Sequence, residues 1–345
     1  MSRRVRLVQP GWDTPLQVET DVPSSPLEAG QVRVAIEACG VCHRDLLDRE
    51  GRFPFMRLPI TPGHEAAGRV VEVGPGVTGL AVGARVATMH RDACGECIAC
   101  RRGETTLCVG AAWVFGLLAD GGYASEVVAP ASAVYDVPEA MPAAHAAVLH
   151  CTFGTAYRDL VTLAGVQSGE RVLVTGANGG VGTAAVQIAA RLGAHVVALV
   201  RSREHEAFLR SLGAAEVAID AKAVSPVDVA VDTVGAPTFI AALHALQIGG
   251  RIVTLGNVTR EKVALNLGFV ITRGLTILGG SGATRDEMRA VLALHAERPF
   301  DFPIARTLPL ASADEAQRLV LAGGLRGRIV LEPGSFQEDT ACDSD

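Results

Sequence analysis

The chain has 345 residues, of which 49% are hydrophobic and 20% charged, a composition typical of a globular protein rather than a disordered or fibrous one. Thirty-one Lys and Arg residues stand against 37 Asp and Glu residues, so the net charge is −6. This balance offers no basic face to a phosphate backbone, and we expect no nucleic-acid partner. At about 150 residues per domain, the length predicts two domains.

The first residues, MSRRVRLVQPGWDTP, are basic but lack the apolar core and the cleavage site of a secretory signal. No run of apolar residues is long enough to span a membrane. We therefore expect a cytoplasmic protein without a membrane partner.

The opening part of the chain alternates apolar and polar residues between glycine and proline turns, as in QVRVAIEACG at 31–40 and GRVVEVGPGV at 68–77. This pattern predicts a β-rich, partly barrel-like domain. Two further features stand out in the same region. Cysteines gather in a short segment, and a histidine with a neighbouring acid, His64 and Glu65, occurs in PGHEAAG.

Cys42, His64, Glu65 and Cys151 are dispersed along the chain, yet two thiolates and one imidazole would leave the fourth position of a zinc ion open. An open position is what a Lewis-acid catalyst requires. On spacing alone the alternative stays open that the cysteines are small buried hydrophobes and that His64 is a core histidine.

The segment CGECIACRRGETTLC carries a denser cysteine pattern. Two residues separate each of its first three thiols, and seven precede the fourth, Cys108. Four thiolates would fill every position around a tetrahedral zinc ion, so this spacing predicts a closed, structural site. In a reducing compartment, clustered thiols are more often metal ligands than disulfides. The predicted ligands are Cys94, Cys97, Cys100 and Cys108.

From about Phe153 the pattern changes to strands that alternate with helices. Expected strands lie at 171–176, 195–200, 228–235, 251–257 and 275–280, and helical patterns include 183–193 and 238–250. This alternation predicts a parallel, doubly wound sheet. Further helical patterns at 288–299 and 313–324 precede a last strand at 327–333, and we expect the polar tail from Gly334, with Cys342, to be frayed and without function.

A glycine-rich turn, GANGGVG, joins the first expected strand of this sheet to its helix. Such a turn lets the backbone approach a pyrophosphate at the positive end of the helix, although tight structural turns also use glycine. The candidate cofactor-binding residues here are Gly176, Asn178, Gly179, Gly180, Val181 and Gly182, with Gly256 and Asn257 at the end of a later strand.

Cofactor choice depends on the residues that follow the second strand, where an acidic residue would bind the ribose of NAD. Here the chain reads Arg201, Ser202, Arg203. Guanidinium groups suit a 2′-phosphate, so the sequence favours NADP(H) over NAD(H). The alternative is that both arginines are ordinary solvated charges.

Together, GVCHRD, PGHEAAG, the four-thiol segment, LHCTFGTAY and GANGGVG resemble the zinc-containing alcohol dehydrogenase branch of the medium-chain dehydrogenase/reductase family. The resemblance implies a Rossmann domain at 153–280, inserted into a GroES-like catalytic domain made of 1–152 and 281–345. It implies a catalytic zinc on Cys42, His64 and Cys151, with Glu65 able to exchange with water on the metal. It also implies that Asp45 orients His64, that Arg328 reaches the cofactor pyrophosphate, and that the chain forms dimers or tetramers.

The sequence departs from that pattern two residues after Cys42, where the branch usually carries the hydroxyl that relays the alcohol proton. Arg44 occupies this place, and a guanidinium stays protonated near neutral pH. Either His43 or water takes over the relay, or the substrate is not a simple alcohol. Arg44 would then pair with Asp45 or bind an acidic group of the substrate.

Three functional hypotheses follow for this two-zinc, nicotinamide-dependent design. The leading one is reversible hydride transfer between NADP(H) and an alcohol, aldehyde or ketone. The second is reduction of an enoyl thioester, because the CHRD variant and the later segments resemble acryloyl-CoA reductase-like members of the family. The third is a binding protein that keeps the fold without turnover.

Overall fold

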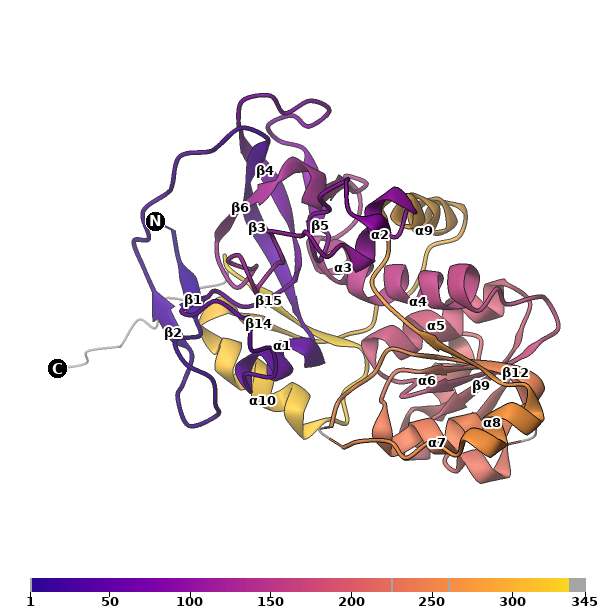
Figure 1. Ribbon diagram of the computed structural model, residues 1–345. Coiled ribbons are helices and arrows are strands. Elements are labelled where there is room, and N and C mark those ends of the chain that lie inside the picture. The colour runs from indigo at the N-terminus through magenta and orange to yellow at the C-terminus, as the bar shows by residue number, and fades with distance from the viewer. Residues whose placement is uncertain (1, 225, 260, 335–345) are drawn as a thin grey trace.

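The computed structural model describes residues 2–224, 226–259 and 261–334. Its body consists of two sheets that lie side by side (Figure 1). A separate two-stranded sheet pairs β1 (Arg4–Arg6) with β2 (Gln17–Glu19). In the part of the chain that the structure describes, no helix is both long and apolar enough to cross a membrane.

The six-stranded sheet is parallel throughout and has the order β10-β9-β8-β11-β12-β13. Its strands are β8 (Arg171–Thr175), β9 (His195–Leu199), β10 (Glu216–Ala218), β11 (Val227–Asp232), β12 (Leu246–Thr254) and β13 (Thr276–Gly279). Helix α5 (Gly180–Arg191) packs on one face of the sheet, and α7 (Ala236–Ala245) and α8 (Leu267–Arg273) cover the other (Figure 1). Helix α6 (Glu206–Ser211) precedes β10. The predicted doubly wound parallel sheet is therefore present.

The seven-stranded sheet combines both ends of the chain in the order β14-β15-β3-β4-β5-β7, with β6 paired to β3. Its pairs are antiparallel except for β14 and β15. The strands are β3 (Gln31–Val41), β4 (Glu65–Val73), β5 (Arg85–Thr88), β6 (Glu126–Pro130), β7 (Val134–Asp136), β14 (Ile304–Pro309) and β15 (Arg328–Glu332). Alternating apolar residues of β3 and β4 fill its core, as their sequence pattern predicts.

A long helical segment leads from the seven-stranded sheet to the six-stranded sheet. It runs through α3 (Ala143–Leu149), the π-helical turn η3 (His150–Gly154), α4 (Thr155–Tyr157) and a second π-helical turn, η4 (Arg158–Leu163). Such π-turns often occur at functional sites because they turn a side chain out of the regular helical register. Here the first π-turn carries Cys151.

The remaining helices are α1 (His43–Arg49), α2 (Ile98–Arg101), α9 (Arg285–Glu297) and α10 (Ala313–Ala322). The predicted helix at 238–250 is wrong beyond Ala245, because residues from Leu246 begin β12. A helix is unfavourable through Gly249 and Gly250, whereas the β-strand gains a ladder with β11. The tail from residue 335, with Cys342, lies outside the described residues.

Candidate active site

Four potential metal ligands from distant parts of the chain meet between the two sheets. Cys42 caps the start of α1, His64 and Glu65 lie at the start of β4, and Cys151 comes from the π-turn. Their ligand atoms all lie within 4.8 Å of one another. The Cys42 and Cys151 sulfurs are 3.9 Å apart, and the Cys151 sulfur is 3.7 Å from His64 Nε2.

These distances suit a tetrahedral metal. Ligand atoms that lie about 2.0–2.3 Å from a central zinc ion stand roughly 3.3–3.8 Å from one another. His64 Nε2 is also 4.0 Å from Glu65 Oε1, so the carboxylate lies next to the three other ligand atoms at a slightly longer distance. The donor set of two sulfurs, one imidazole nitrogen and one carboxylate therefore fits a catalytic zinc.

Asp45 fixes the orientation of this site. Its Oδ1 accepts a hydrogen bond of 2.8 Å from His64 Nδ1, which turns Nε2 toward the sulfurs. Its Oδ2 accepts from the Cys42 backbone N–H at 2.9 Å and from the Tyr123 hydroxyl at 3.1 Å. A carboxylate bonded to the second nitrogen of a ligating histidine holds the ring in place. Tyr123 was not predicted, because nothing in its local sequence shows that it lies beside Asp45.

Arg328, the first residue of β15, lies against the same cluster. Its Nη2 is 3.1 Å from Glu65 Oε1, 3.4 Å from the Cys42 sulfur and 3.7 Å from the Cys151 sulfur. Burial raises the pKa of Glu65 to about 7, although the Arg328 guanidinium acts in the opposite direction. Arg328 thus offsets part of the negative charge that the thiolates and the carboxylate gather here.

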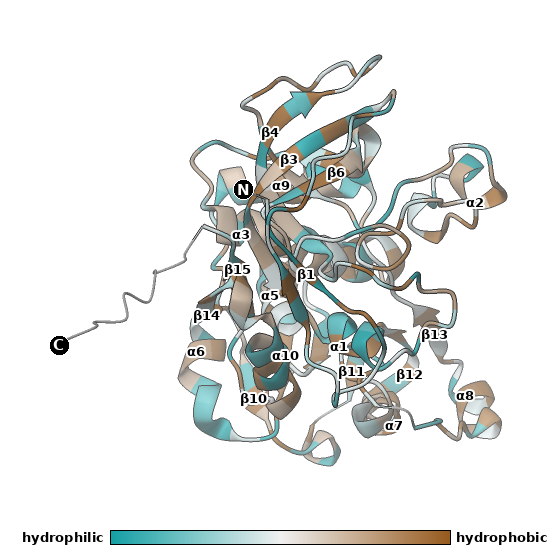
Figure 2. Ribbon diagram, turned by 90° about the vertical axis from the view of Figure 1, so that its left-hand side faces the viewer, coloured by the Kyte–Doolittle hydropathy of each residue, from teal (hydrophilic) through white to brown (hydrophobic). Residues whose placement is uncertain are grey.

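The second cysteine group forms a lobe, residues 94–108, around α2 that projects from the body of the molecule (Figure 2). The Cys94 and Cys108 sulfurs are 3.5 Å apart, Cys94 and Cys100 3.9 Å, and Cys97 and Cys108 4.0 Å. The Cys94 backbone N–H also donates to the Cys108 sulfur. All seven cysteines in the described residues are free. The lobe has the donors and the spacing of a closed tetrathiolate site.

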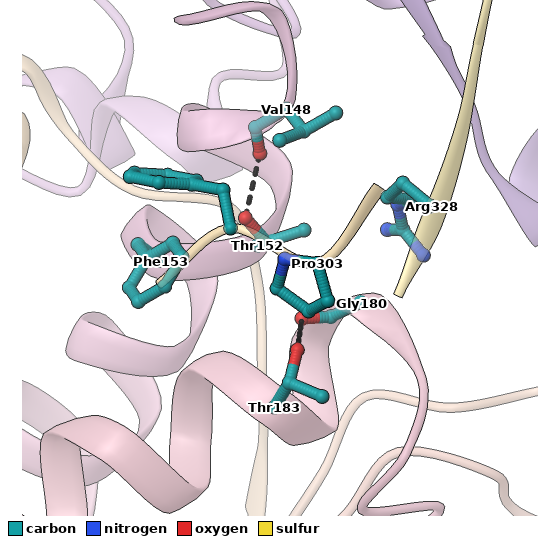
Figure 3. Close-up of a pocket in the computed structure, with 8 residues that line it drawn as sticks. Val148, Thr152, Phe153, Gly180, Thr183, Pro303 and Arg328 are labelled. Carbon is teal, nitrogen blue, oxygen red and sulfur yellow. Dashed lines mark hydrogen bonds between the residues drawn. The ribbon is translucent and has the colours of Figure 1, made fainter. Parts of the chain in front are cut away.

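The glycine turn lies between β8 and α5, and glycine is required there by close contacts. A Cβ on Gly182 would lie 2.2 Å from the Gly176 carbonyl oxygen, and one on Gly180 would lie 2.6 Å from Arg328 Cζ. Arg328 therefore lies over the start of α5 (Figure 3). In the described structure no side chain caps this helix, so its first N–H groups and the guanidinium suit a pyrophosphate.

The turn is joined to the end of the chain by two hydrogen bonds. The Gly327 N–H donates to the Asn178 carbonyl oxygen at 2.9 Å, and Asn178 Nδ2 donates to the Leu325 carbonyl oxygen at 3.0 Å. These bonds bring the segment before β15, and with it Arg328, onto the turn. Gly179 takes part in the same contact through a β-bridge to Gly327, and Val181 follows in the first turn of α5.

Gly256 and Asn257 follow β12 at the carboxyl ends of the parallel strands, the edge of the sheet where the glycine turn also lies. A Cβ on Gly256 would lie 2.1 Å from the backbone of Thr233, which follows β11. Buried Asp232 holds this edge together, since its carboxylate accepts hydrogen bonds from the Thr175 hydroxyl and the Gly235 N–H. Dinucleotides bind at this edge of open parallel sheets.

Arg201, Ser202 and Arg203 follow β9 and are exposed. Arg203 Nη1 forms an ion pair of 2.6 Å with Glu206. A Cβ on Gly323 would lie 2.9 Å from Arg201 Nη2, so the Arg201 guanidinium reaches the loop after α10. Both guanidinium groups thus lie just after the second strand of the sheet, and that of Arg203 is paired with Glu206.

The structure also shows what surrounds His43 and Arg44. His43 Nε2 lies 3.3 Å from the Val258 carbonyl oxygen. Arg44 Nε forms an ion pair of 3.2 Å with Asp48, one helical turn further on, and Nη1 donates to the Phe115 carbonyl oxygen. The pairing of Arg44 with Asp45 left open by the sequence is therefore wrong, because both Asp45 oxygens are engaged by other donors.

Family models match most of the chain. Residues 28–139 match the alcohol dehydrogenase GroES-like domain, and residues 180–297 match the zinc-binding dehydrogenase domain. An acryloyl-coenzyme A reductase of Sulfurisphaera tokodaii is 32% identical over 95% of this chain and 99% of its own length. The chain belongs to the zinc-containing alcohol dehydrogenase family.

Two further comparisons agree with this assignment. An alcohol dehydrogenase of Geobacillus stearothermophilus is 35% identical over 90% of this chain and 94% of its own length. The crystal structure of an NAD-dependent alcohol dehydrogenase superposes with a TM-score of 0.90 at 32% identity, covering 96% of this chain and all of the other. The predicted Rossmann and GroES-like fold and the prediction of an oxidoreductase are confirmed, and the hypothesis of a binding protein without turnover loses its support. The family uses zinc and a nicotinamide cofactor.

Proposed function

We propose that this zinc-containing dehydrogenase transfers hydride from NADPH to the β-carbon of an α,β-unsaturated thioester. One observation carries this choice. Arg44 stands where the family usually has a proton-relaying hydroxyl, and its guanidinium is bound to Asp48 and to the Phe115 carbonyl oxygen. Alcohol and aldehyde interconversion requires a proton at the reacting oxygen, whereas enoyl reduction takes its proton at carbon. The similarity to an acryloyl-coenzyme A reductase supports the proposal.

Each group of predicted ligands has a separate role in this proposal. Cys42, His64 and Cys151 would hold a catalytic zinc, and Cys94, Cys97, Cys100 and Cys108 a structural one, which gives two zinc ions per chain. When bound, the zinc supplies a Lewis acid and the nicotinamide supplies the hydride.

Asp45 holds His64 in the ligating orientation. Arg328 has two partners within reach, Glu65 and the start of α5. We propose that it neutralises the cofactor pyrophosphate and leaves Glu65 free to approach the metal. In the overall reaction, NADPH and one proton are consumed and two hydrogens are added across the C=C bond.

The second candidate is reversible conversion of an alcohol with its aldehyde or ketone, favoured by the three-ligand set and by the alcohol dehydrogenases among the relatives. A substrate panel separates the two. We expect crotonyl-CoA to support NADPH oxidation with a kcat/KM about 100-fold or more above that of butyraldehyde, a difference of roughly 2.7 kcal/mol in transition-state stabilisation. Turnover of aldehydes alone would contradict the enoyl proposal and leave the second candidate.

We also propose that NADP(H) is preferred over NAD(H), although one structural relative is named NAD-dependent. The support is the pair of exposed guanidinium groups after β9, with no acidic residue at Leu199 or Val200. Changing Arg201 and Arg203 together to alanine should raise the KM for NADPH about 10-fold or more, because charge-assisted hydrogen bonds to the 2′-phosphate are lost. The KM for NADH should stay the same.

Arg210→Ala is the matched control, since Arg210 is exposed on α6 and pairs with the same Glu206 as Arg203. If the double variant leaves the KM for NADPH unmoved, or the control raises it equally, the assignment of the cofactor is wrong.

We propose further that the chain divides into a catalytic domain of residues 1–152 and 281–345 and a cofactor domain of 153–280. The support is that strands from both ends of the chain form the seven-stranded sheet, whereas the middle of the chain forms the six-stranded sheet. Free cysteines in the described residues favour a reducing compartment, which supports a cytoplasmic location.

A homo-oligomer is proposed from the free edge of the six-stranded sheet. Strand β13 lies at that edge. Four solvent-exposed apolar side chains belong to β13 and its neighbouring segments: Ile248, Leu267, Ile271 and Ile277. An edge strand with apolar neighbours is suited to pair with its copy about a two-fold axis. Brown segments of α8 mark this surface in Figure 2.

Changing Leu267 and Ile271 to glutamate should convert the oligomer to monomers, because two charges would enter the apolar contact. Light scattering after size-exclusion chromatography measures the mass. Val82→Glu provides the control, since Val82 is 66% exposed and lies beside the other sheet. An unchanged mass for the double variant, or a monomeric wild type, would refute this interface.

A further inference from the structure

Arg44 has one nitrogen without a partner. The side chain is 21% exposed, and two of its three nitrogens are engaged, Nε by Asp48 and Nη1 by the Phe115 carbonyl oxygen at 3.2 Å. Nη2 is buried, and no residue within the described structure accepts a hydrogen bond from it. A buried donor without an acceptor is costly, so this nitrogen suits an acceptor that the described chain does not supply.

A second buried nitrogen without a partner lies nearby, on His90. Within the described residues, His90 Nε2 has no hydrogen-bond partner. The Phe115 N–H donates to the backbone carbonyl oxygen of His90 at 3.0 Å, and the Phe115 carbonyl accepts from the Arg44 guanidinium, so both residues are bonded to Phe115. The His90 ring stands edge-on to His64, with 5.0 Å between ring centroids. His90 therefore lies beside the catalytic cluster, and Arg44 lies in the first turn of α1, the helix that Cys42 caps.

The charge around Arg44 indicates which kind of acceptor its free nitrogen suits. Asp48 is 1% exposed and forms an ion pair with Arg44. Burial raises the pKa of Asp48 to about 6, with Arg44 acting in the opposite direction, so the carboxyl is mostly ionised at neutral pH. Arg44 is thus neutralised by its own helix, and the remaining N–H is better matched to a neutral carbonyl oxygen than to a carboxylate.

We infer that Arg44 Nη2, together with His90 in the tautomer that carries its proton on Nε2, donates to the acyl oxygen of the substrate and so selects thioesters over simple aldehydes. This inference rests on the proposed function and adds to it the residues that determine specificity. When hydride is added to the β-carbon of an enoyl thioester, the electron pair of the C=C bond moves toward the acyl carbonyl, and negative charge develops on its oxygen. That oxygen is three bonds from the carbon that accepts hydride. Donors aimed at the place where charge develops stabilise the transition state.

The test uses two ligands that differ by one oxygen atom, butyryl-CoA and its thioether analogue S-butyl-CoA. Calorimetry on the zinc-loaded protein with NADP⁺ measures the Kd of each. We expect the wild type to bind the thioester about 10-fold or more tightly than the thioether. That ratio should fall toward unity in Arg44→Met/Asp48→Asn, in which the buried acid is neutralised together with its partner, and separately in His90→Phe. Zinc content and the Kd for NADPH should not change.

Arg289→Met, an exposed arginine on α9, should keep the wild-type ratio. A wild type that binds both ligands equally, or variants that keep the preference for the thioester, would overturn the inference while the proposed function stands. If the Arg44 variant does not fold, His90→Phe decides alone. A wild type that binds neither ligand would contradict the proposed function itself.

Discussion

Replacing Cys42 with serine is expected to lower turnover with every substrate by about 1,000-fold or more, roughly 4 kcal/mol of transition-state stabilisation. The hydroxyl of serine is a poor zinc ligand, so the catalytic ion would be lost while the rest of the fold is kept. Cys42 lies 3.9 Å from the Cys151 sulfur and caps α1, but it makes no contact with the glycine turn that the structure shows. NADPH binding, measured by fluorescence titration, should therefore stay near its wild-type value.

Cys39→Ala is the matched control for this experiment. Cys39 is also a buried cysteine, on the same strand that leads to Cys42, but it is not among the clustered ligands. Its replacement should leave turnover within about three-fold of the wild type, as expected for a change that removes one buried sulfur without a ligand role. A Cys42→Ser variant with full activity would remove the catalytic role from the cluster.

The second large effect is expected in the cysteine lobe. Residues 94–108 contain only one short α-helix and one turn of 3₁₀-helix, and Ile98 and Leu107 are 59% and 54% exposed. Little apolar burial holds the lobe, so we expect the proposed zinc ion to stabilise it. Changing Cys97 to serine should release that ion, lower the thermal midpoint by about 5 °C or more and open the lobe to proteases.

The lobe also contacts the rest of the molecule through Arg158, whose Nη2 binds Glu104 and whose Nε donates to the Ser281 hydroxyl at 3.0 Å. Differential scanning calorimetry measures the thermal midpoint of the Cys97→Ser variant, and cleavage by trypsin at Arg101 or Arg102 measures the opening of the lobe. Glu96→Gln, a change in the same loop that removes no thiol, should behave like the wild type. A Cys97→Ser variant with an unchanged midpoint and an intact lobe would show that the thiolates do not stabilise it.

The sequence allowed the local features to be predicted and left the long-range ones undetermined. The four lobe cysteines lie within fifteen residues, so their spacing alone predicts a shared ion. The glycine turn is equally local, because the close contact of Gly182 with Gly176 is a property of one strand-to-helix connection. In contrast, Cys42 and Cys151 are separated by 109 positions, and only the fold brings them together.

Other contacts in the site carried no usable signal in the sequence. Tyr123 reaches Asp45 across 78 positions, and Phe115 joins Arg44 to His90 through backbone atoms that any residue could supply. Asp45 was one of the alternatives that the sequence left open for Arg44, but residues four apart face each other on a helix, which places Asp48 beside it. The prediction of a helix through residue 250 was wrong because it considered only the local pattern. The pairing of β12 with β11, which is a long-range contact, outweighs the local helical pattern there.

The central claim is that Cys42, His64 and Cys151 hold one zinc ion apart from the ion of the cysteine lobe. Zinc analysis by plasma mass spectrometry of the purified wild type and of Cys42→Ser tests it most directly. The account predicts two zinc ions per wild-type chain and one in the variant, with the remaining ion lost only when Cys97 is also changed. One ion in the wild type, or two ions retained in Cys42→Ser, would contradict it.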